Sequence, residues 1–362
     1  MYGEHDYEVL TSAREGLQRQ EDHFGSKQRH DTDGYNIIPF GYCTYRNRSD
    51  DGKFAFNINT ISEKAIVSKF YPVFRFTNAN STFMAEFLNS SPRVKKKLSV
   101  LAVGTSQVVL SFEALKAAKF DLPCKDEQDK IAAFLECLNA RIENQRTLVV
   151  ALKKYKRGVV RTLLSPKRCS IKNVKWTTSR IGDIGTFIKG APLSKADISL
   201  EGTPFILYGE LYTTYSEVIS NVVRKTQASA DKQYYSQIGD VIIPTSGETP
   251  EEISTASCVM LPDIILAGDL NIYRCTQVDG RIMSYILNHV VNDRIARIAQ
   301  GKSVVHVQAA EISKIEITYP DPFSQKTIIA LLAAISDRID QSNAELRLLH
   351  ELRKALLQKL FI

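Results

Sequence analysis

Apolar residues recur at alternating steps of four and three along two stretches of the sequence. The two stretches align without a gap when the sequence is shifted by 197 positions, which places residues 104–165 on residues 301–362. This spacing is the heptad pattern of a coiled coil, and it predicts one long helix in each copy. The seam of the first copy consists of Ile131, Leu135, Leu138, Ile142, Gln145, Val149, Leu152, Lys156, Val159 and Leu163. The seam of the second copy consists of Ile328, Leu332, Ile335, Ile339, Ser342, Leu346, Leu349, Arg353, Leu356 and Leu360.

Both seams contain a polar residue at the same two positions. Gln145 matches Ser342, and Lys156 matches Arg353. Polar seam residues fix register and partner at a cost in stability, so the shared pair predicts that the two helices are partners. A pseudo-twofold axis between like units would make this pair antiparallel. The alternative is that each helix packs only on its own globular domain.

Short runs rich in aromatic and β-branched residues precede each helix and predict strands. They lie at residues 35–39, 53–58, 65–68 and 73–76, and again at 204–207, 240–244 and 264–267. Helices are predicted at 82–89 and 284–299, whereas residues 1–33 are polar and weakly patterned. The predicted fold class is α+β, with two strand-rich domains separated by an antiparallel coiled coil. The predicted parts are a first domain at 1–123, a helix at 124–166, a linker and second domain at 167–320, and a helix at 321–362.

The globular regions also resemble each other, because Gly239–Pro244 echoes Gly34–Pro39. On this alignment the first domain is shorter at its start by about 28 residues. The sequence leaves two alternatives open: a short first domain that functions by itself, or a truncated or recombining copy whose first domain is completed by another gene's product.

Composition limits the class of protein. Hydrophobic residues make up 44% and charged residues 24% of the 362 residues, which is typical of a globular protein. The net charge of +7 favours a polyanionic partner. No apolar run approaches the roughly 20 residues that cross a membrane, so we expect a cytoplasmic protein without a membrane partner. The six cysteines show no zinc-like spacing, and we expect no metal site.

No catalytic motif is present in the sequence. Gly301, Lys302 and Ser303 resemble the end of a phosphate-binding loop, but Ala296 stands where that loop requires glycine. A nucleophile elbow and a metal-spaced cluster are also missing. We therefore expect a non-catalytic chain that holds no cofactor itself.

Several basic and amide-rich segments are candidates for DNA contact. Residues 42–48 mix aromatics and amides with two arginines, which suits base stacking, guanine pairing or phosphate contact, although a solvated hairpin explains them equally well. Residues 144–182 hold eleven basic residues and no carboxylate. The candidate DNA-binding residues are Tyr45, Arg46, Asn47, Arg48, Lys95, Lys96, Lys97, Thr105, Gln107, Lys153, Lys154, Lys156, Arg157, Lys189, Arg294, Arg297, Lys302 and Ser303.

The two repeated blocks carry a family resemblance. FDLPCKDEQDKIAAFLECLNARIENQ and ITYPDPFSQKTIIALLAAISDRIDQS share a Pro/Gln/Ile/Arg-Ile pattern. With a strand-rich domain before each helix, the sequence resembles the DNA specificity subunit of type I restriction–modification systems. The resemblance implies two target-recognition domains that read the halves of a split sequence in double-stranded DNA. It also implies two methyltransferase subunits, which use S-adenosylmethionine, and motor/endonuclease subunits as partners. The alternative from another class is a coiled-coil scaffold or regulatory protein that binds partners without reading DNA.

Overall fold

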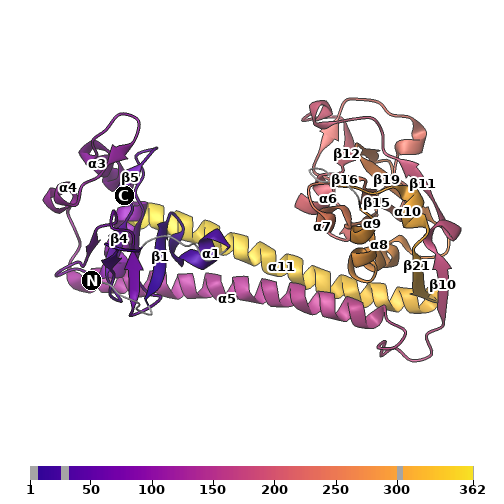
Figure 1. Cartoon of the computed structure of the whole chain (residues 1–362), viewed down its shortest axis with the longest axis horizontal. Helices are drawn as coiled ribbons and strands as arrows, with labels where there is room; N and C mark the ends of the chain where they lie inside the picture. Colours follow the sequence, from indigo (N-terminus) through magenta and orange to yellow (C-terminus); the bar gives the residue numbers. More distant parts are fainter. Residues whose placement is uncertain (1–6, 26–31, 300–304, 362) are drawn as a thin grey trace. The chain divides into compact units, whose positions relative to one another are not determined.

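The computed structural model describes residues 7–25, 32–299 and 305–361, and the chain divides into two compact units (Figure 1). Unit 1 comprises Met1–Thr147 and Asn343–Ile362, and unit 2 comprises Leu148–Ser342. Each unit therefore holds one strand-rich region together with part of both long helices.

Unit 1 builds three small sheets and several short helices before the first long helix. The sheets have the strand orders β2-β1-β7-β3, β6-β4-β8 and β5-β9. The elements are β1 (Glu8–Ala13), β2 (Gly16–Arg19), α1 (Gln20–Phe24), β3 (Asn36–Ile37), β4 (Cys43–Tyr45), β5 (Arg48–Ser49), β6 (Phe56–Ile58), β7 (Ala65–Val67), β8 (Val73–Phe74), α2 (Ser81–Ser90), α3 (Pro92–Leu101), β9 (Val108–Val109), α4 (Phe112–Ala117) and α5 (Lys125–Leu163).

Unit 2 contains a larger set of strands. Its sheets have the orders β11-β19-β15-β17-β13, β14-β12-β18, β10-β21 and β16-β20. The elements are β10 (Trp176–Arg180), β11 (Gly185–Lys189), β12 (Thr203–Leu207), α6 (Glu210–Thr213), β13 (Val218–Ile219), β14 (Lys225–Thr226), β15 (Asp240–Pro244), β16 (Ser246–Gly247), α7 (Pro250–Ile253), β17 (Ser257–Val259), β18 (Ile265–Ala267), β19 (Leu270–Cys275), α8 (Gly280–His289), α9 (Asn292–Ile298), β20 (Val305–His306), α10 (Ala309–Ser313), β21 (Glu316–Pro320) and α11 (Pro322–Leu360).

The two long helices pack against each other in each unit. In unit 1, Leu138 and Ile142 of α5 share a buried cluster with Leu349 of α11. In unit 2, Leu163 of α5 and Ile328 of α11 belong to one core. Residue numbers rise along α5 as they fall along α11, so the pair is antiparallel. The predicted helix pair and α+β class are confirmed, and the alternative of helices that pack only on their own domains is excluded.

Each long helix has 39 residues, which corresponds to about 58 Å at about 1.5 Å per residue. The predicted seam fails only near the C-terminus of α11. There Leu360 is 39% exposed, while Leu357 and Phe361 are buried against Leu135 and α2. The aromatic ring of Phe361 lies against the rings of Phe83 and Phe87, which moves the buried stripe by one position.

A glutamine near the start of each long helix makes the same two hydrogen bonds, and we call this arrangement the glutamine clasp. Gln128 Nε2 donates to the Pro123 carbonyl at 2.9 Å, and its Oε1 accepts from the Asn80 backbone N–H at 3.0 Å. Gln325 repeats both bonds in unit 2, at 2.8 Å to the Pro320 carbonyl and 2.8 Å from the N–H of Asp279. Both glutamines are buried, so their satisfied amides join α5 to the start of α2 and α11 to the start of α8.

A second repeated contact fixes the strand next to that helix. Asn89 of α2 exchanges two hydrogen bonds with the backbone of Phe56, at 2.7 and 2.9 Å. Asn288 of α8 makes the same two bonds with Ala256, at 2.6 and 3.1 Å. The globular parts of the two units are therefore copies of one design.

The repeated bonds correct the sequence alignment of the two domains. The N–H of Gly239 donates to the carbonyl of Val259 at 2.9 Å. Its counterpart is Gly41, whose N–H donates to the backbone carbonyl of Asn59 at 2.8 Å. Gly239–Pro244 thus corresponds to Gly41–Arg46 and not, as the sequence suggested, to Gly34–Pro39. Residues 34–39 and 41–46 of unit 1 contain similar residue types. Only the strand pairing shows which of the two segments corresponds to residues 239–244.

Three further features differ from the sequence expectation. Residues 1–33, which lacked a clear pattern, contain β1, β2 and α1 within their described part. The helix predicted at 284–299 is two helices, α8 and α9, because the backbone turns at Val290 and Val291. In unit 1 the described residues contain no counterpart of β10 or β11, since β1 already corresponds to β12 by its parallel pairing.

Candidate nucleic-acid interface

A hollow of about 430 Å³ in unit 1 collects basic side chains. Arg46 is exposed and makes no ion pair or hydrogen bond with any residue that the structure describes. The guanidinium of Arg48 lies 5.4 Å from the centre of the Phe70 ring. Four cationic side chains face two carboxylates in the lining, namely Arg14, Arg46, Arg48 and Lys53 against Glu15 and Asp50. This balance suits phosphate or the acceptor edge of guanine.

Strand pairing positions the two central arginines. Arg46 and Arg48 lie where the chain passes from β4 to β5, and β5 pairs with β9. The N–H of Leu110, just after β9, donates to the carbonyl of Asn47 at 2.9 Å. The backbone is therefore held while the two guanidinium groups stay accessible.

Asp51 organises one side of this hollow. Its carboxylate accepts from the Ser49 hydroxyl at 2.9 Å and lies 2.8 Å from the guanidinium of Arg14. The Ser49 hydroxyl, the Lys53 backbone N–H and Arg14 together lower the pKa of Asp51 to about 2. Asp51 therefore stays anionic and orients Arg14 at neutral pH.

Unit 2 contains an equivalent hollow of about 840 Å³. Its walls include residues 208–210 and 246–248, which correspond to residues 11–13 and 48–50 of the first hollow. The side chains differ, because Tyr208 and Tyr212 join Lys195 and Arg224 against three carboxylates. These carboxylates belong to Glu210, Glu248 and Asp269.

The carboxylates of this second hollow are only partly neutralised. Buried Glu210 pairs with Arg224 at 2.8 Å and accepts from the N–H of Leu207 at 3.0 Å. Asp269 accepts from the Ser246 hydroxyl at 3.0 Å, and Glu248 is exposed. The second hollow thus has more carboxylates and fewer cationic side chains than the first.

One predicted DNA contact is wrong. Tyr45 is fully buried, and its hydroxyl donates to the carbonyl of Leu110 at 2.9 Å. Its ring packs against Phe56 with the ring centres 4.9 Å apart. Tyr45 is a core residue whose neighbours Arg46 and Arg48 reach the surface.

The other sequence candidates are distributed over several elements. Lys95, Lys96 and Lys97 are exposed on α3, and Lys97 donates to the carbonyl of Lys119. Gln107 donates to Asp50 at 3.0 Å beside the first hollow, which brings it near Arg48. Exposed positions away from both hollows are those of Thr105, Lys153, Lys154, Arg157, Lys189, Arg294 and Arg297. Lys302 and Ser303 lie outside the described residues.

The comparison with family models decides the classification. The model "Type I restriction modification DNA specificity domain" matches residues 4–152 and 173–350, one match for each repeat. The chain belongs to this specificity-domain family. A search of curated protein sequences gave no match.

Solved structures support the fold of this specificity-domain chain. The type I restriction–modification S subunit from M. genitalium is 16% identical, with a TM-score of 0.58, and the match covers 99% of this chain and 89% of that one. A chain from a structure described as the basis of complex assembly and conformational transition of the type I R-M system is 17% identical. Its TM-score is 0.57, with 92% of this chain and 84% of that chain covered.

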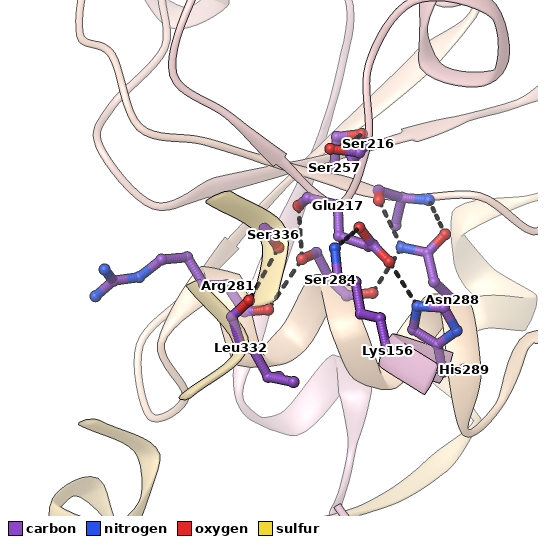
Figure 2. Close-up of polar contacts among 11 residues, drawn as sticks. Lys156, Ser216, Glu217, Ser257, Arg281, Ser284, Asn288, His289, Leu332 and Ser336 are labelled. Carbon is purple, nitrogen blue, oxygen red and sulfur yellow. Dashed lines mark hydrogen bonds and ion pairs between the residues drawn. The ribbon is translucent and has the colours of Figure 1, made fainter. Parts of the chain in front are cut away.

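Lys156 of the specificity-domain chain is also not a DNA contact, because it is buried. Its ammonium group donates to Glu217 Oε2 at 2.7 Å, and His289 Nε2 lies 2.7 Å from Glu217 Oε1 (Figure 2). Burial alone would raise the pKa of Glu217, but His289 and Lys156 outweigh it and lower the pKa to about 2. The sequence of the basic segment 144–182 gave no sign of the Lys156–Glu217 pair, because Glu217 lies 61 residues after Lys156.

This carboxylate predicts a measurable pH dependence of stability. Its folded pKa of about 2 lies below the unfolded value of about 4.3, so its contribution is present above pH 4.3 and is lost as pH falls toward 2. We expect Glu217→Gln to flatten the decline of unfolding free energy between about pH 5 and pH 3 in urea titrations. Exposed Glu201→Gln is the control, and equal pH slopes for wild type and Glu217→Gln would contradict the assignment.

Sequence reasoning missed Arg14 and Lys53 of the first hollow and every residue of the second. Arg14 lies in the segment that showed no strand pattern, and the second hollow contains no basic cluster. Within the described ranges, no group of histidine, cysteine and carboxylate side chains is arranged to hold a metal ion. Within those ranges no helix is both long and apolar enough to cross a bilayer.

Proposed function

We propose that this chain is the DNA-recognition subunit of a type I restriction–modification complex and reads a bipartite target. Each unit would read one half-site through its hollow. The observation that carries the proposal is that one hollow recurs at the same place of both repeats with different side chains, as two different half-sites require. The chain itself would perform no catalysis; S-adenosylmethionine would be used by the partner methyltransferase.

Repeated exposed apolar residues on the long helices support the docking of two like partners. Phe134 and Leu331 occupy equivalent positions and are 50% and 47% exposed. Tyr155 and Leu352 form a second equivalent pair, 61% and 49% exposed. Exposed apolar groups repeated in both copies fit a protein partner that binds twice. We propose that these positions receive two methyltransferase subunits, to which motor/endonuclease subunits add.

The test is a map of methylated adenines in DNA from cells that express this chain with its neighbouring methyltransferase. The proposal expects a split motif with a fixed gap. Purified complex should also bind that motif with an affinity that falls as salt rises. Partner binding without sequence preference would instead support the coiled-coil scaffold.

A second test concerns the gap between the half-sites. Deleting the matched heptads 145–151 and 342–348 removes about 10 Å from each helix, which equals about three base pairs at 3.4 Å per pair. If the helices set the gap, as proposed, the methylated motif of the shortened protein will have a gap shorter by about three base pairs. An unchanged gap in a folded, active variant would exclude this role.

A further inference from the structure

Two cations, one buried and one partly exposed, occupy the same repeat position in the seams of the long helices. Lys156 of α5 is 8% exposed, and the side chain of its counterpart Arg353 of α11 is 29% exposed. The proposed reading of DNA uses neither residue. Each cation nevertheless contacts the globular part of its unit.

In unit 2 the cation is held by a complete polar cluster (Figure 2). Glu217 accepts from Lys156 and His289, both at 2.7 Å. The Ser284 hydroxyl donates to the backbone carbonyl of Glu217 at 2.8 Å, and the Lys156 ammonium lies 5.3 Å from the centre of the Tyr285 ring. Ser284 and His289, both on α8, thus hold Glu217 in the position where its carboxylate accepts from Lys156.

In unit 1 a carboxylate at a different place in the repeat binds the cation. Arg353 donates to Glu86 of α2, and its Nε donates to Asn139 of α5 at 2.6 Å. The residue that corresponds to Glu86 in unit 2 is Tyr285, on the equivalent helix α8. The two copies therefore keep the cation but supply its carboxylate from different places.

The topology of these pairs is also shared. The domain of unit 2 is followed in sequence by α11, yet its cation comes from α5. The domain of unit 1 is followed by α5, yet its cation comes from α11. Each ion pair thus ties a globular domain to the long helix of the other repeat.

Stability alone does not explain these cations. A buried ion pair is often no more stabilising than apolar side chains of similar size, and the neighbouring seam positions are leucine and valine. An apolar seam tolerates a shift or rotation of the domain, whereas an ion pair requires one register.

We propose that Lys156 and Arg353 are positioning residues, which fix the register and angle of each recognition domain on the long helix of the other repeat. This inference rests on the proposed function. The base pairs that each hollow reaches depend on that angle, so the cations determine how strictly a half-site is read.

The experiment compares methylated-adenine maps for the full chain expressed with its methyltransferase. We expect Lys156→Met to relax discrimination by about 10-fold at one or more positions of the half-site read by unit 2, comparable to one lost base contact. Gaps one base pair longer or shorter should also become methylated. The other half-site, identified as the one that changes in variants of Arg46 and Arg48, should stay unchanged. Lys156→Arg should keep the wild-type motif, and Arg338→Met, which removes an exposed charge from α11 in the same unit, is the matched control.

Two outcomes overturn parts of this scheme separately. If folded Lys156→Met methylates only the wild-type motif and gap, the lysine is not a positioning residue. If Lys156→Met fails to fold because Glu217 is left buried and unpaired, Lys156→Met combined with Glu217→Gln removes that charge, and the same comparison decides. A wild-type chain that yields no split motif refutes the proposed function itself.

Discussion

Replacing both Arg46 and Arg48 by alanine should lower the affinity for target DNA by about 100-fold or more. Each arginine paired with guanine contributes about 1–3 kcal/mol of discrimination, so two lost contacts reach this size. Fold stability should change little, because both side chains are exposed. Fluorescence anisotropy at fixed salt, with the motif found by methylation mapping, measures the effect.

The matched control removes the same charge elsewhere in unit 1. Arg75 and Arg93 are exposed and do not line the basic hollow, so Arg75→Ala combined with Arg93→Ala changes net charge equally. The control should weaken binding only through general electrostatics, with a smaller effect. Equal affinities for the two double variants would show that the hollow is not the reading surface.

Introducing aspartate at Phe134 and Leu331 should abolish co-purification of the methyltransferase. Burying a side chain of this size contributes about 1.5–3 kcal/mol, and a carboxylate in the same interface adds a desolvation cost. Each single variant should retain one methyltransferase copy, and the double variant none. Mass photometry of the purified complexes measures this stoichiometry.

Phe323 provides the control for that experiment. It is 80% exposed, but its repeat counterpart is Asp126, so it belongs to no repeated apolar pair. Phe323→Asp should leave two methyltransferase copies bound. If the Phe134 and Leu331 variants also retain both copies, the proposed docking positions are wrong.

The long helices could be predicted from sequence because their burial follows a single period over most of their 39 residues. The globular domains could not be predicted to the same depth. In β1, Leu10 and Ser12 are both buried, and the Ser12 hydroxyl accepts from the Asn57 amide at 2.8 Å. A buried polar residue of this kind masks the alternation that marks a strand.

The candidate site was predicted in part for a related reason. Arg46 and Arg48 stand out as charges within an aromatic segment, but Tyr45 beside them looks equally accessible in sequence. All three residues of β4 are buried. The usual alternation of buried and exposed positions is therefore missing, and the sequence does not show that Tyr45 is buried while Arg46 and Arg48 are exposed. Lys156 and Glu217 are joined only by the tertiary fold, and no local pattern reveals a partner that far along the chain.

The repeated hydrogen bonds and the two hollows use separate sets of residues. The clasps of Gln128 and Gln325 and the pairs formed by Asn89 and Asn288 line neither hollow. Substitutions in a hollow therefore leave these repeated bonds intact. Under the proposed function, new DNA targets would be reached by substitutions in the hollows, one half-site at a time, while these repeated bonds are kept.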